Sequence, residues 1–395
     1  MIGGRRPFLK GVAAGVCTPV LGSLASCTPA RTKPPQTAAP RTFPEPSSQP
    51  ETAPVSSKAA PPERTTTRPN HKAPSEQLEA TSTDSELEDG QVPRRRFGRH
   101  NESVSVVGLG GHTLKLAGSV ASAREIVARA TSHGITFFEN AWDYHGGSAE
   151  EVMGEALQGQ SRDRLFLMSK FCTFHSERYS RDKAGAMKML EDSLRRLRTD
   201  YLDLWMLHNV SGNDAELAYR DDSAIAALEL AKKQGKIRYT GFTGHTDPKI
   251  HVDLIQRGFD WDATLMPVSA LGALSAQRFE REVMPLCEQK NIAVLGMKGF
   301  GGSKRAFLHG KTNVEEIVRY SLSYQQVCSH MIGIDKLPYV NEAAHATQKK
   351  PMSTFERERH VFNLKAQNAE QYAMYLDPEY QQCYREGRLH PCQLG

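Results

Sequence analysis

Residues 182–240 read DKAGAMKMLEDSLRRLRTDYLDLWMLHNVSGNDAELAYRDDSAIAALELAKKQGKIRYT, and the pattern of this stretch predicts the fold class. The apolar run 202–207 has the length of a buried strand, and 237–240 predicts the strand that follows it. Residues 223–234 predict a helix that Gly235 ends. Four apolar side chains at helical spacing predict another helix over 182–198: Met187, Leu190, Leu194 and Leu197. Strands and helices therefore alternate, as in a parallel sheet whose strands are connected by helices.

The same alternation extends from residue 104 to residue 334. Eight predicted strands cover 104–109, 135–138, 165–168, 202–207, 237–240, 263–266, 293–296 and 330–334. Eight strand–helix units in roughly 250 residues match the size of a closed (β/α)8 TIM barrel. A doubly wound sheet is the alternative, but the first turn, 108–111, lacks the G-x-G-x-x-G pattern and its following acid. We therefore expect an α/β fold of the TIM-barrel class, preceded by a disordered N-terminal segment.

Composition favours small-molecule chemistry over nucleic-acid binding. The 395 residues are 39% hydrophobic and 24% charged, and the formal net charge is +5. No long basic block interleaved with aromatic residues is present, so we expect no nucleic-acid partner. The seven cysteines lie far apart, without a C-x-x-C pair or zinc-ligand spacing, and we expect no metal: Cys17, Cys27, Cys172, Cys287, Cys328, Cys383 and Cys392.

The first 27 residues have the pattern of an export signal. Arg5 and Arg6 precede Phe8 and a weakly apolar run over 11–25, which is too short and glycine-rich for a membrane-spanning helix. This resembles a twin-arginine (Tat) signal, and Leu24-Ala25-Ser26-Cys27 resembles a lipobox, in which the thiol is acylated. The resemblance implies passage through the Tat export machinery. It also implies a lipoprotein anchored to a bacterial membrane through Cys27, in the periplasm or on the outer cell surface.

Residues 28–92 predict a disordered, proline-rich linker. Twelve of the 22 prolines fall there, and the only Phe, Trp or Tyr is Phe43. Such a segment buries too little apolar surface to offset its ordering entropy. We expect it to connect the signal to a barrel over 93–350, with a C-terminal tail over 351–395.

Polar side chains follow several predicted strands at the point where each strand ends. Glu139 and Tyr144 follow the second strand, Lys170 follows the third, and His208 follows the fourth. In a barrel these ends meet at one mouth, where active sites lie. Taken singly, His208 could be a core imidazole, and Lys170 and Glu139 a rim ion pair. Their occurrence at successive strand ends favours catalysis.

Three blocks resemble the signatures of the aldo/keto reductase family: residues 137–144 (FFENAWDY), 167–170 (LMSK) and 201–208 (YLDLWMLH). The resemblance runs from about residue 94 to residue 347. It implies that Tyr144 is the proton donor, Lys170 the lysine beside it, His208 the histidine and Glu139 the carboxylate that pairs with the lysine. The carboxylate is usually aspartate, so we expect weakened geometry here and a retained mechanism.

These residue types suit the reduction of a carbonyl. Hydride delivered from a nicotinamide to the carbonyl carbon leaves negative charge on the oxygen, which needs a proton. The Tyr144 hydroxyl can supply it, and a lysine cation held by Glu139 would favour its release. His208 would orient the carbonyl. The expected activity is reduction of aldehydes or ketones to alcohols, or the reverse, with a small-molecule carbonyl or alcohol substrate.

The cofactor side follows later strands. A glycine-rich loop over 296–304 suits a pyrophosphate. Thr243, in the segment after the predicted strand 237–240, lies where the resemblance implies that the family binds the nicotinamide carboxamide. The predicted cofactor-binding residues are Thr243, Gly244, Met297, Lys298, Gly299, Gly301, Ser303, Lys336 and Glu342. Gly244, Leu265, Met297 and Ala343 replace the asparagine, glutamine, tyrosine and asparagine usual in the family. Lys298, Lys304 and Lys336 could meet a 2′-phosphate, which favours NADP, with NAD possible.

Three alternatives stay open. Cys383 and Cys392 could form a disulfide, or either could be unpaired. The barrel could be a non-catalytic binding protein with altered cofactor contacts. It could also be a metal-dependent hydrolase, which five residues near strand ends suggest: His112, His145, His208, His245 and Asp335.

Overall fold

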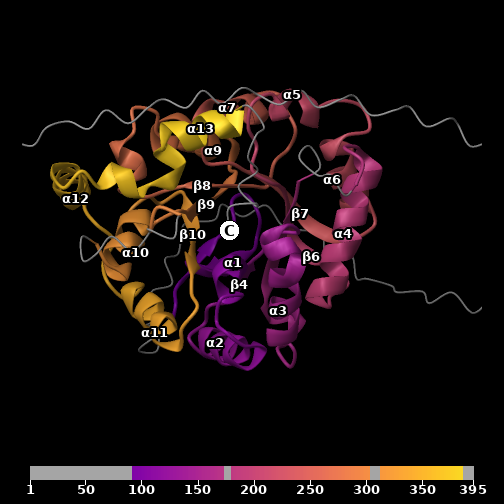
Figure 1. Cartoon of the computed structure of the whole chain (residues 1–395), viewed down its shortest axis with the longest axis horizontal. Helices are drawn as coiled ribbons and strands as arrows, with labels where there is room; N and C mark the ends of the chain where they lie inside the picture. Colours follow the sequence, from indigo (N-terminus) through magenta and orange to yellow (C-terminus); the bar gives the residue numbers. More distant parts are fainter. Residues whose placement is uncertain (1–90, 173–178, 303–311, 386–395) are drawn as a thin grey trace, which may run out of the picture. The chain divides into compact units, whose positions relative to one another are not determined.

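The computed structural model describes residues 91–172, 179–302 and 312–385. Eight parallel strands close into a barrel in the order β10-β3-β4-β5-β6-β7-β8-β9, which confirms the predicted (β/α)8 fold (Figure 1). The barrel strands are β3 (Val107–Gly110), β4 (Phe137–Glu139), β5 (Phe166–Phe171), β6 (Leu202–Leu207), β7 (Ile237–Thr243), β8 (Ala263–Pro267), β9 (Ala293–Met297) and β10 (Val327–Gly333). The predicted signal and linker, residues 1–90, lie outside the described residues.

Helices connect the strands and form an outer layer around them (Figure 1). The longer ones are α2 (Val120–Ser132), α3 (Ser148–Ala156), α4 (Lys183–Leu197), α6 (Ala224–Lys233), α7 (Pro248–Gln256), α10 (Val314–Leu322), α11 (Leu337–Ala346), α12 (Thr354–Ala366) and α13 (Pro378–Arg385). Shorter ones are α1 (Gly111–Leu114), α5 (Asp214–Ala218), α8 (Phe279–Glu282) and α9 (Met284–Lys290). Single 3-10 turns are η1 (Tyr144–Gly147), η2 (Arg162–Arg164), η4 (Gly272–Leu274), η5 (Ala369–Tyr372) and η6 (Met374–Leu376).

Local signals fix the two helices that the sequence predicts best. Asp182 is the N-cap of α4 and accepts a hydrogen bond from the Gly185 N–H at 2.8 Å, while Arg198 ends the helix at φ +56°. Helix α6 begins after Ser223 and ends before Gly235, which adopts φ +71°. Both helices therefore end where the sequence predicts.

The prediction of a single first strand over 104–109 is wrong in one respect, because the structure has two strands there with different partners. β2 (Ser103–Ser105) pairs antiparallel with β1 (Arg94–Arg96), and the barrel strand β3 begins only at Val107. The chain changes partner at Val106, whose N–H donates to the Pro93 carbonyl. The β1–β2 hairpin also places Phe97, which is fully buried, against Phe166 inside the barrel.

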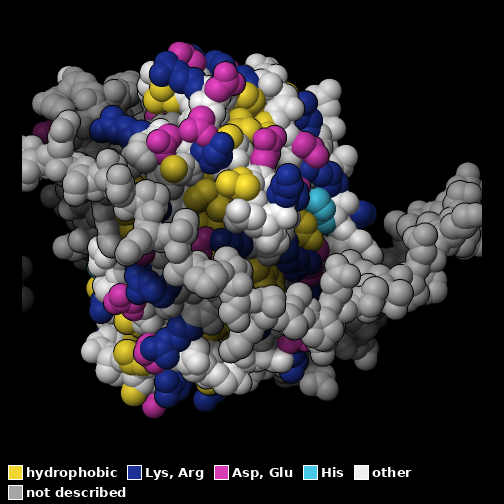
Figure 2. Space-filling view, turned by 90° about the vertical axis from the view of Figure 1, so that its right-hand side faces the viewer, with side chains coloured by type: hydrophobic (Ala, Val, Ile, Leu, Met, Phe, Trp, Pro, Cys, Tyr) yellow, Lys and Arg dark blue, Asp and Glu magenta, His cyan; other side chains and the backbone are white. Residues whose placement is uncertain are grey.

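Apolar side chains of the barrel form two packed layers, and a third cluster packs the described C-terminal segment onto it. One fills the barrel interior and includes Phe137, Leu204 and Leu295. The larger layer lies between the strands and the helices. On the face shown in Figure 2, basic and acidic side chains alternate over the described surface. No helix among the described residues is both long enough and apolar enough to cross a bilayer.

The described part of the C-terminal tail packs onto the loops after three neighbouring strands. The Met374 N–H donates to the Gly301 carbonyl after β9, and the Tyr375 hydroxyl lies 3.0 Å from the Ser269 hydroxyl after β8. The Tyr380 hydroxyl lies 2.9 Å from Nε2 of His245, which follows β7. The Cys383 side chain and Cys392 lie outside the described residues, so their pairing stays a prediction.

Candidate active site

The four predicted catalytic side chains meet at the carboxyl ends of neighbouring strands. Glu139 is the last residue of β4, Lys170 lies in β5, His208 follows β6, and Tyr144 begins η1 after β4. Parallel strands of one barrel bring these positions to the same mouth. Their convergence is therefore a product of the topology, although the residues span 70 positions of the chain.

The Lys170 ammonium lies at the centre of this group. Its side chain is 1% exposed, and Nζ donates to the Tyr144 hydroxyl at 3.0 Å and to the Asn140 carbonyl at 2.8 Å. It also forms an ion pair with Glu139. The Tyr144 hydroxyl in turn donates to Glu139 Oε1 at 3.1 Å. A phenol, an ammonium and a carboxylate therefore share one continuous hydrogen-bonded unit.

The longer side chain of Glu139 does not displace the lysine from the tyrosine. One carboxylate oxygen contacts both Lys170 Nζ and the Tyr144 hydroxyl, and Lys170 also lies 4.4 Å from the centre of the tyrosine ring. Burial opposes ionisation of Glu139, but the charge and hydrogen bond of Lys170 and the hydrogen bond from Tyr144 outweigh it and lower the pKa. Glu139 is therefore ionised at neutral pH and remains paired with Lys170.

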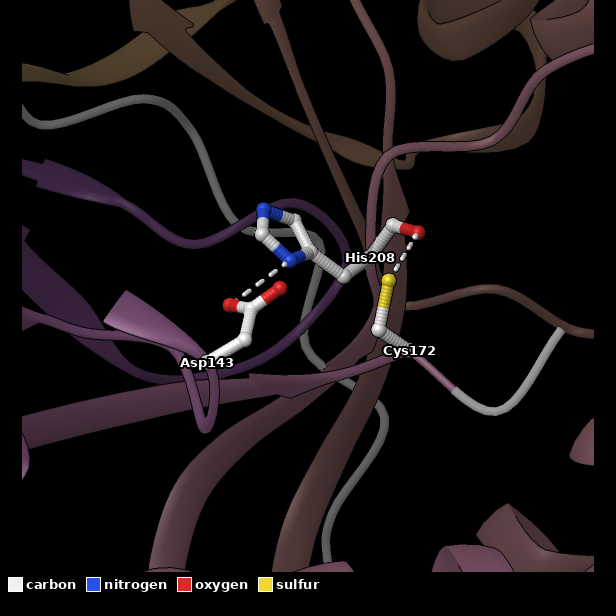
Figure 3. Close-up of side chains that lie close together, drawn as sticks. All are labelled: Asp143, Cys172 and His208. Carbon is white, nitrogen blue, oxygen red and sulfur yellow. Dashed lines mark hydrogen bonds and ion pairs between the residues drawn. The ribbon is translucent and has the colours of Figure 1, made fainter. Parts of the chain in front are cut away.

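His208 lies beside Tyr144 and is held by a carboxylate. The two ring centres are 5.7 Å apart with an edge-on angle of 78°, and His208 Nδ1 lies 3.3 Å from Asp143 Oδ1. Burial alone would lower the pKa of His208, but the neighbouring Asp143 raises it to about 9. His208 therefore carries a positive charge at neutral pH, with Nε2 on the ring edge away from Asp143 (Figure 3).

A buried ion pair holds the loop that carries Asp143 and Tyr144. Arg196 of α4 donates to the Trp142 carbonyl at 2.7 Å and to Glu150 Oε2 at 3.0 Å, and its side chain is only 4% exposed. Glu150 also accepts from the Ser169 hydroxyl, next to Lys170 in β5. Gly147 is required here, because a Cβ at this position would lie 2.3 Å from the Arg196 guanidinium carbon. The ion pair thereby connects the tyrosine loop to the lysine strand.

The predicted cofactor residues lie at three places in the fold: at the end of β7, at and after the end of β9, and at α11. Thr243 ends β7 and is buried, followed by buried Gly244; Met297 ends β9 and is half-buried. Lys298 adopts φ +63°, Gly299 is buried, and Gly301 and Gly302 adopt φ +82° and +76°. Lys336 is the N-cap of α11, and Glu342 is exposed on that helix. Ser303 and Lys304 lie outside the described residues.

These residues fit the phosphates of a dinucleotide in two ways. Helix α11 begins without a side-chain cap at Lys336, so backbone N–H groups and a cation lie at the same helix end. After β9, a Cβ on Gly302 would lie 2.6 Å from Lys298 Cδ, so the lysine stem lies against the loop backbone. For the carboxamide, buried Thr243 is present, while Leu265 contributes only an apolar side chain to the barrel interior.

The five residues that suggested a metal hydrolase do not form one cluster. The His112 and His145 rings are 4.4 Å apart, His208 pairs with Asp143, and His245 contacts Tyr380. Burial lowers the pKa of His112 to about 4. Among the described residues, the group with ligand atoms close enough for a metal is instead Asp143, Cys172 and His208, within 4.8 Å of one another.

Sequence reasoning missed Asp143 and Cys172 as members of the site. Asp143 lies inside the motif 137–144, next to Tyr144, and this position in the sequence could have identified it as a site residue. Cys172 follows the lysine strand by one residue, but nothing in its neighbours indicates that its sulfur reaches His208. Its contact with the His208 carbonyl, at 3.8 Å, joins the ends of β5 and β6 and requires the fold.

The Aldo/keto reductase family model matches residues 106–347. The Escherichia coli protein named methylglyoxal reductase YeaE is 33% identical over 227 residues, which are 54% of this chain and 73% of that protein. L-galactose dehydrogenase of Arabidopsis thaliana is 24% identical over 279 residues, covering 64% of this chain and 87% of that enzyme.

Solved aldo-keto reductases share the fold. The holo form of a Bacillus halodurans enzyme has a TM-score of 0.57 and 24% identity, covering 69% of this chain and 96% of that one. A Klebsiella pneumoniae enzyme, solved in complex with NADPH, has a TM-score of 0.52 and 24% identity, covering 71% and 95%.

Proposed function

Because this chain belongs to the aldo/keto reductase family of NAD(P)H-dependent oxidoreductases, we propose that it reduces an aldehyde or ketone with Tyr144 as the proton donor. The observation that carries the assignment is the contact between Lys170 Nζ and the Tyr144 hydroxyl, at 3.0 Å. A cation at this distance stabilises the phenolate that remains after the proton leaves. Glu139 holds the cation in place and is itself ionised.

His208 supports the same step from the other side of the tyrosine. Asp143 holds one ring nitrogen, so the Nε2–H on the opposite edge donates to the carbonyl oxygen of the substrate. As an imidazolium, His208 is a charged donor and stabilises the negative charge that develops on that oxygen. In the reverse reaction, the Tyr144–Lys170 pair accepts the proton of the alcohol.

The nicotinamide cofactor supplies the hydride when it is bound. Thr243 would hold its carboxamide, and Lys298, the glycine loop after β9 and the N-terminus of α11 would hold its phosphates. The Klebsiella pneumoniae structure contains NADPH. Lys298 and Lys336 favour NADPH, and the remaining polar contacts allow NADH.

The purified full chain should quench NADPH fluorescence and consume NADPH with a simple aldehyde. The name of the Escherichia coli relative makes methylglyoxal a useful first substrate. Tyr144→Phe should lower kcat by about 10²–10⁴, the contribution typical of a positioned acid, while the Kd for NADPH stays unchanged.

Two outcomes would contradict the proposal. If neither NADPH nor NADH binds at millimolar concentration, the chain is a binding protein of the reductase fold. If Tyr144→Phe retains the wild-type rate, another group donates the proton.

We further propose that the chain is exported by the twin-arginine route and anchored through lipidated Cys27. The support is in the sequence alone: Arg5, Arg6 and Phe8 precede a short apolar run that ends at Leu24-Ala25-Ser26-Cys27. Labelled fatty acid should enter the wild-type chain in bacterial cells. Cys27→Ala should take up none, whereas Cys17→Ala serves as the matched control and should be labelled normally. Equal labelling of Cys27→Ala would refute the anchor.

A further inference from the structure

Three side chains of different chemistry converge beside the tyrosine, one from the end of each of three successive strands. Asp143 follows β4, Cys172 follows β5 and His208 follows β6 (Figure 3). An oxygen, a sulfur and a nitrogen from them lie within 4.8 Å of one another. The side chains of Asp143 and His208 are 12% and 8% exposed, and Cys172 is 4% exposed. The group is therefore largely buried at the mouth of the barrel.

We propose that Asp143, Cys172 and His208 form a binding site for a single Zn²⁺ ion. Thiolate, imidazole and carboxylate are the three ligand types that zinc takes in proteins, and three protein ligands leave a fourth position for water. The sulfur and nitrogen donors disfavour Ca²⁺ and Mg²⁺, which require oxygen.

The observed spacing suits a tetrahedral ion. In a tetrahedral site, zinc bonds to nitrogen and oxygen are about 2.0–2.2 Å long. Two such ligand atoms are therefore separated by roughly 3.3–3.5 Å. His208 Nδ1 and Asp143 Oδ1 lie 3.3 Å apart. The Cys172 sulfur lies within 4.8 Å of both atoms and completes the set after a movement of up to roughly 1 Å, which takes a χ1 rotation of roughly 30°.

The geometry argues against a nucleophilic thiol. In a catalytic triad the acid and the nucleophile contact opposite nitrogens of the histidine. Here Asp143 lies at Nδ1, and Nε2 is turned away from both Asp143 and Cys172 (Figure 3). The acid and the thiol therefore lie on the same side of the imidazole, as metal ligands do.

Binding displaces protons and changes the reductase site. Zn²⁺ replaces the proton of the Cys172 thiol and the proton between His208 Nδ1 and Asp143, and both protons pass to solvent. The metal would then hold the His208 ring. The centre of this ring lies 5.7 Å from the centre of the Tyr144 ring. We therefore expect zinc to inhibit carbonyl reduction, and this consequence, unlike the binding itself, rests on the proposed function.

The test measures metal binding to the purified, tag-free full chain. ZnCl₂ is titrated against a chromogenic chelator, and CoCl₂ is added separately to look for a thiolate-to-cobalt charge-transfer band. The wild type should bind one equivalent at this site and show the band. Cys172→Ser should lose the band and bind zinc at least roughly tenfold more weakly, the loss that even outer-shell changes bring. Asp143→Asn should retain the band and bind more weakly.

Cys328→Ser is the matched control, because Cys328 is also buried and not disulfide-bonded but lies in β10. It should behave as the wild type, and circular dichroism of each variant reports that it is folded. A wild type without the band, or a band that persists in Cys172→Ser, would overturn the zinc site.

Turnover is assayed with and without ZnCl₂, each variant relative to its own metal-free rate. Zinc should inhibit the wild type and Cys328→Ser but spare Cys172→Ser. Metal binding by a chain that reduces no carbonyl would refute the function and leave the site standing. Turnover without metal binding would refute only the site.

Discussion

The extra methylene of Glu139 changes which atoms its carboxylate contacts. The aldo/keto reductase pattern usually has aspartate there, and the longer chain of Glu139 reaches both Lys170 Nζ and the Tyr144 hydroxyl through one oxygen. The carboxylate thus holds the lysine and accepts a hydrogen bond from the Tyr144 hydroxyl in the resting state. For proton donation to a substrate, the hydroxyl must turn away from Glu139 toward the carbonyl oxygen.

Glu139→Gln should therefore lower kcat by about tenfold or more, though less than Tyr144→Phe, because an amide leaves the Lys170 cation buried without its counter-charge. Glu139→Asp should recover most of the rate, since it restores the charge beside the lysine. The measurement is kcat against pH for the three proteins. A Gln variant with the wild-type pH profile and rate would show that the carboxylate only fills space.

At the scale of elements, helix α4 positions a loop that belongs to a different strand. Its residue Arg196 reaches the Trp142 carbonyl and Glu150 of α3, and Trp142 Nε1 donates back to Asp192 of α4 at 3.1 Å. The loop that carries Asp143 and Tyr144 is thus fixed from both sides. Burial raises the pKa of Glu150, and the hydrogen bonds from Ser169 and Arg196 only partly offset this.

Arg196→Met should reduce the free energy of unfolding by about 3–5 kcal/mol, because removing one partner leaves the Glu150 carboxylate buried alone. Arg195→Met is the matched control: its side chain is 65% exposed, and its loss should change stability by less than about 0.5 kcal/mol. Urea unfolding of the two variants distinguishes them. Equal, small losses would show that the buried pair does not hold the loop.

For the molecule as a whole, buried histidines make stability depend on pH. Burial lowers the pKa of His251 to about 3 and that of His330 to about 4. Below their unfolded pKa near 6.5, the unfolded chain binds protons that the folded barrel excludes, so stability falls as pH falls from there toward 4. His208 has the opposite sign: with its pKa raised to about 9, its contribution is complete below pH 6.5 and is lost as pH rises toward 9.

Between pH 6.5 and pH 5, we expect each of the two histidines to reduce the free energy of unfolding by up to about 1.4 kcal/mol per pH unit. His251→Phe should reduce this dependence, since the ring packs between Phe242 and Phe279 and a phenyl ring has no proton to bind. Urea unfolding of both proteins at pH 7, 6 and 5 measures the slope. A His251→Phe variant with the same slope as the wild type over this interval would contradict the prediction.

The fold class, most strand positions and the four residues at the barrel mouth could be predicted without the structure. Helical periodicity over 182–198 and short apolar runs such as 202–207 are local properties, so they can be read without a structure. The barrel is then favoured over an open sheet, because eight such units in roughly 250 residues match its size and the first turn lacks the G-x-G-x-x-G pattern of a doubly wound sheet. The division of the first strand at Val106 could not be read from the sequence, since no turn residue separates Val104 from Val107 and only the partners of the two halves differ.

The contacts that these residues make with one another could not be predicted without the fold. Whether Glu139 would displace Lys170 depends on an oxygen position that no spacing reveals, and the fold holds both at Tyr144. Cys172 and His208 are 36 residues apart and meet because β5 and β6 pair in register. The physical reason is general: periodicity reports which face of an element is buried, but side-chain contacts between elements depend on register and closure of the whole sheet.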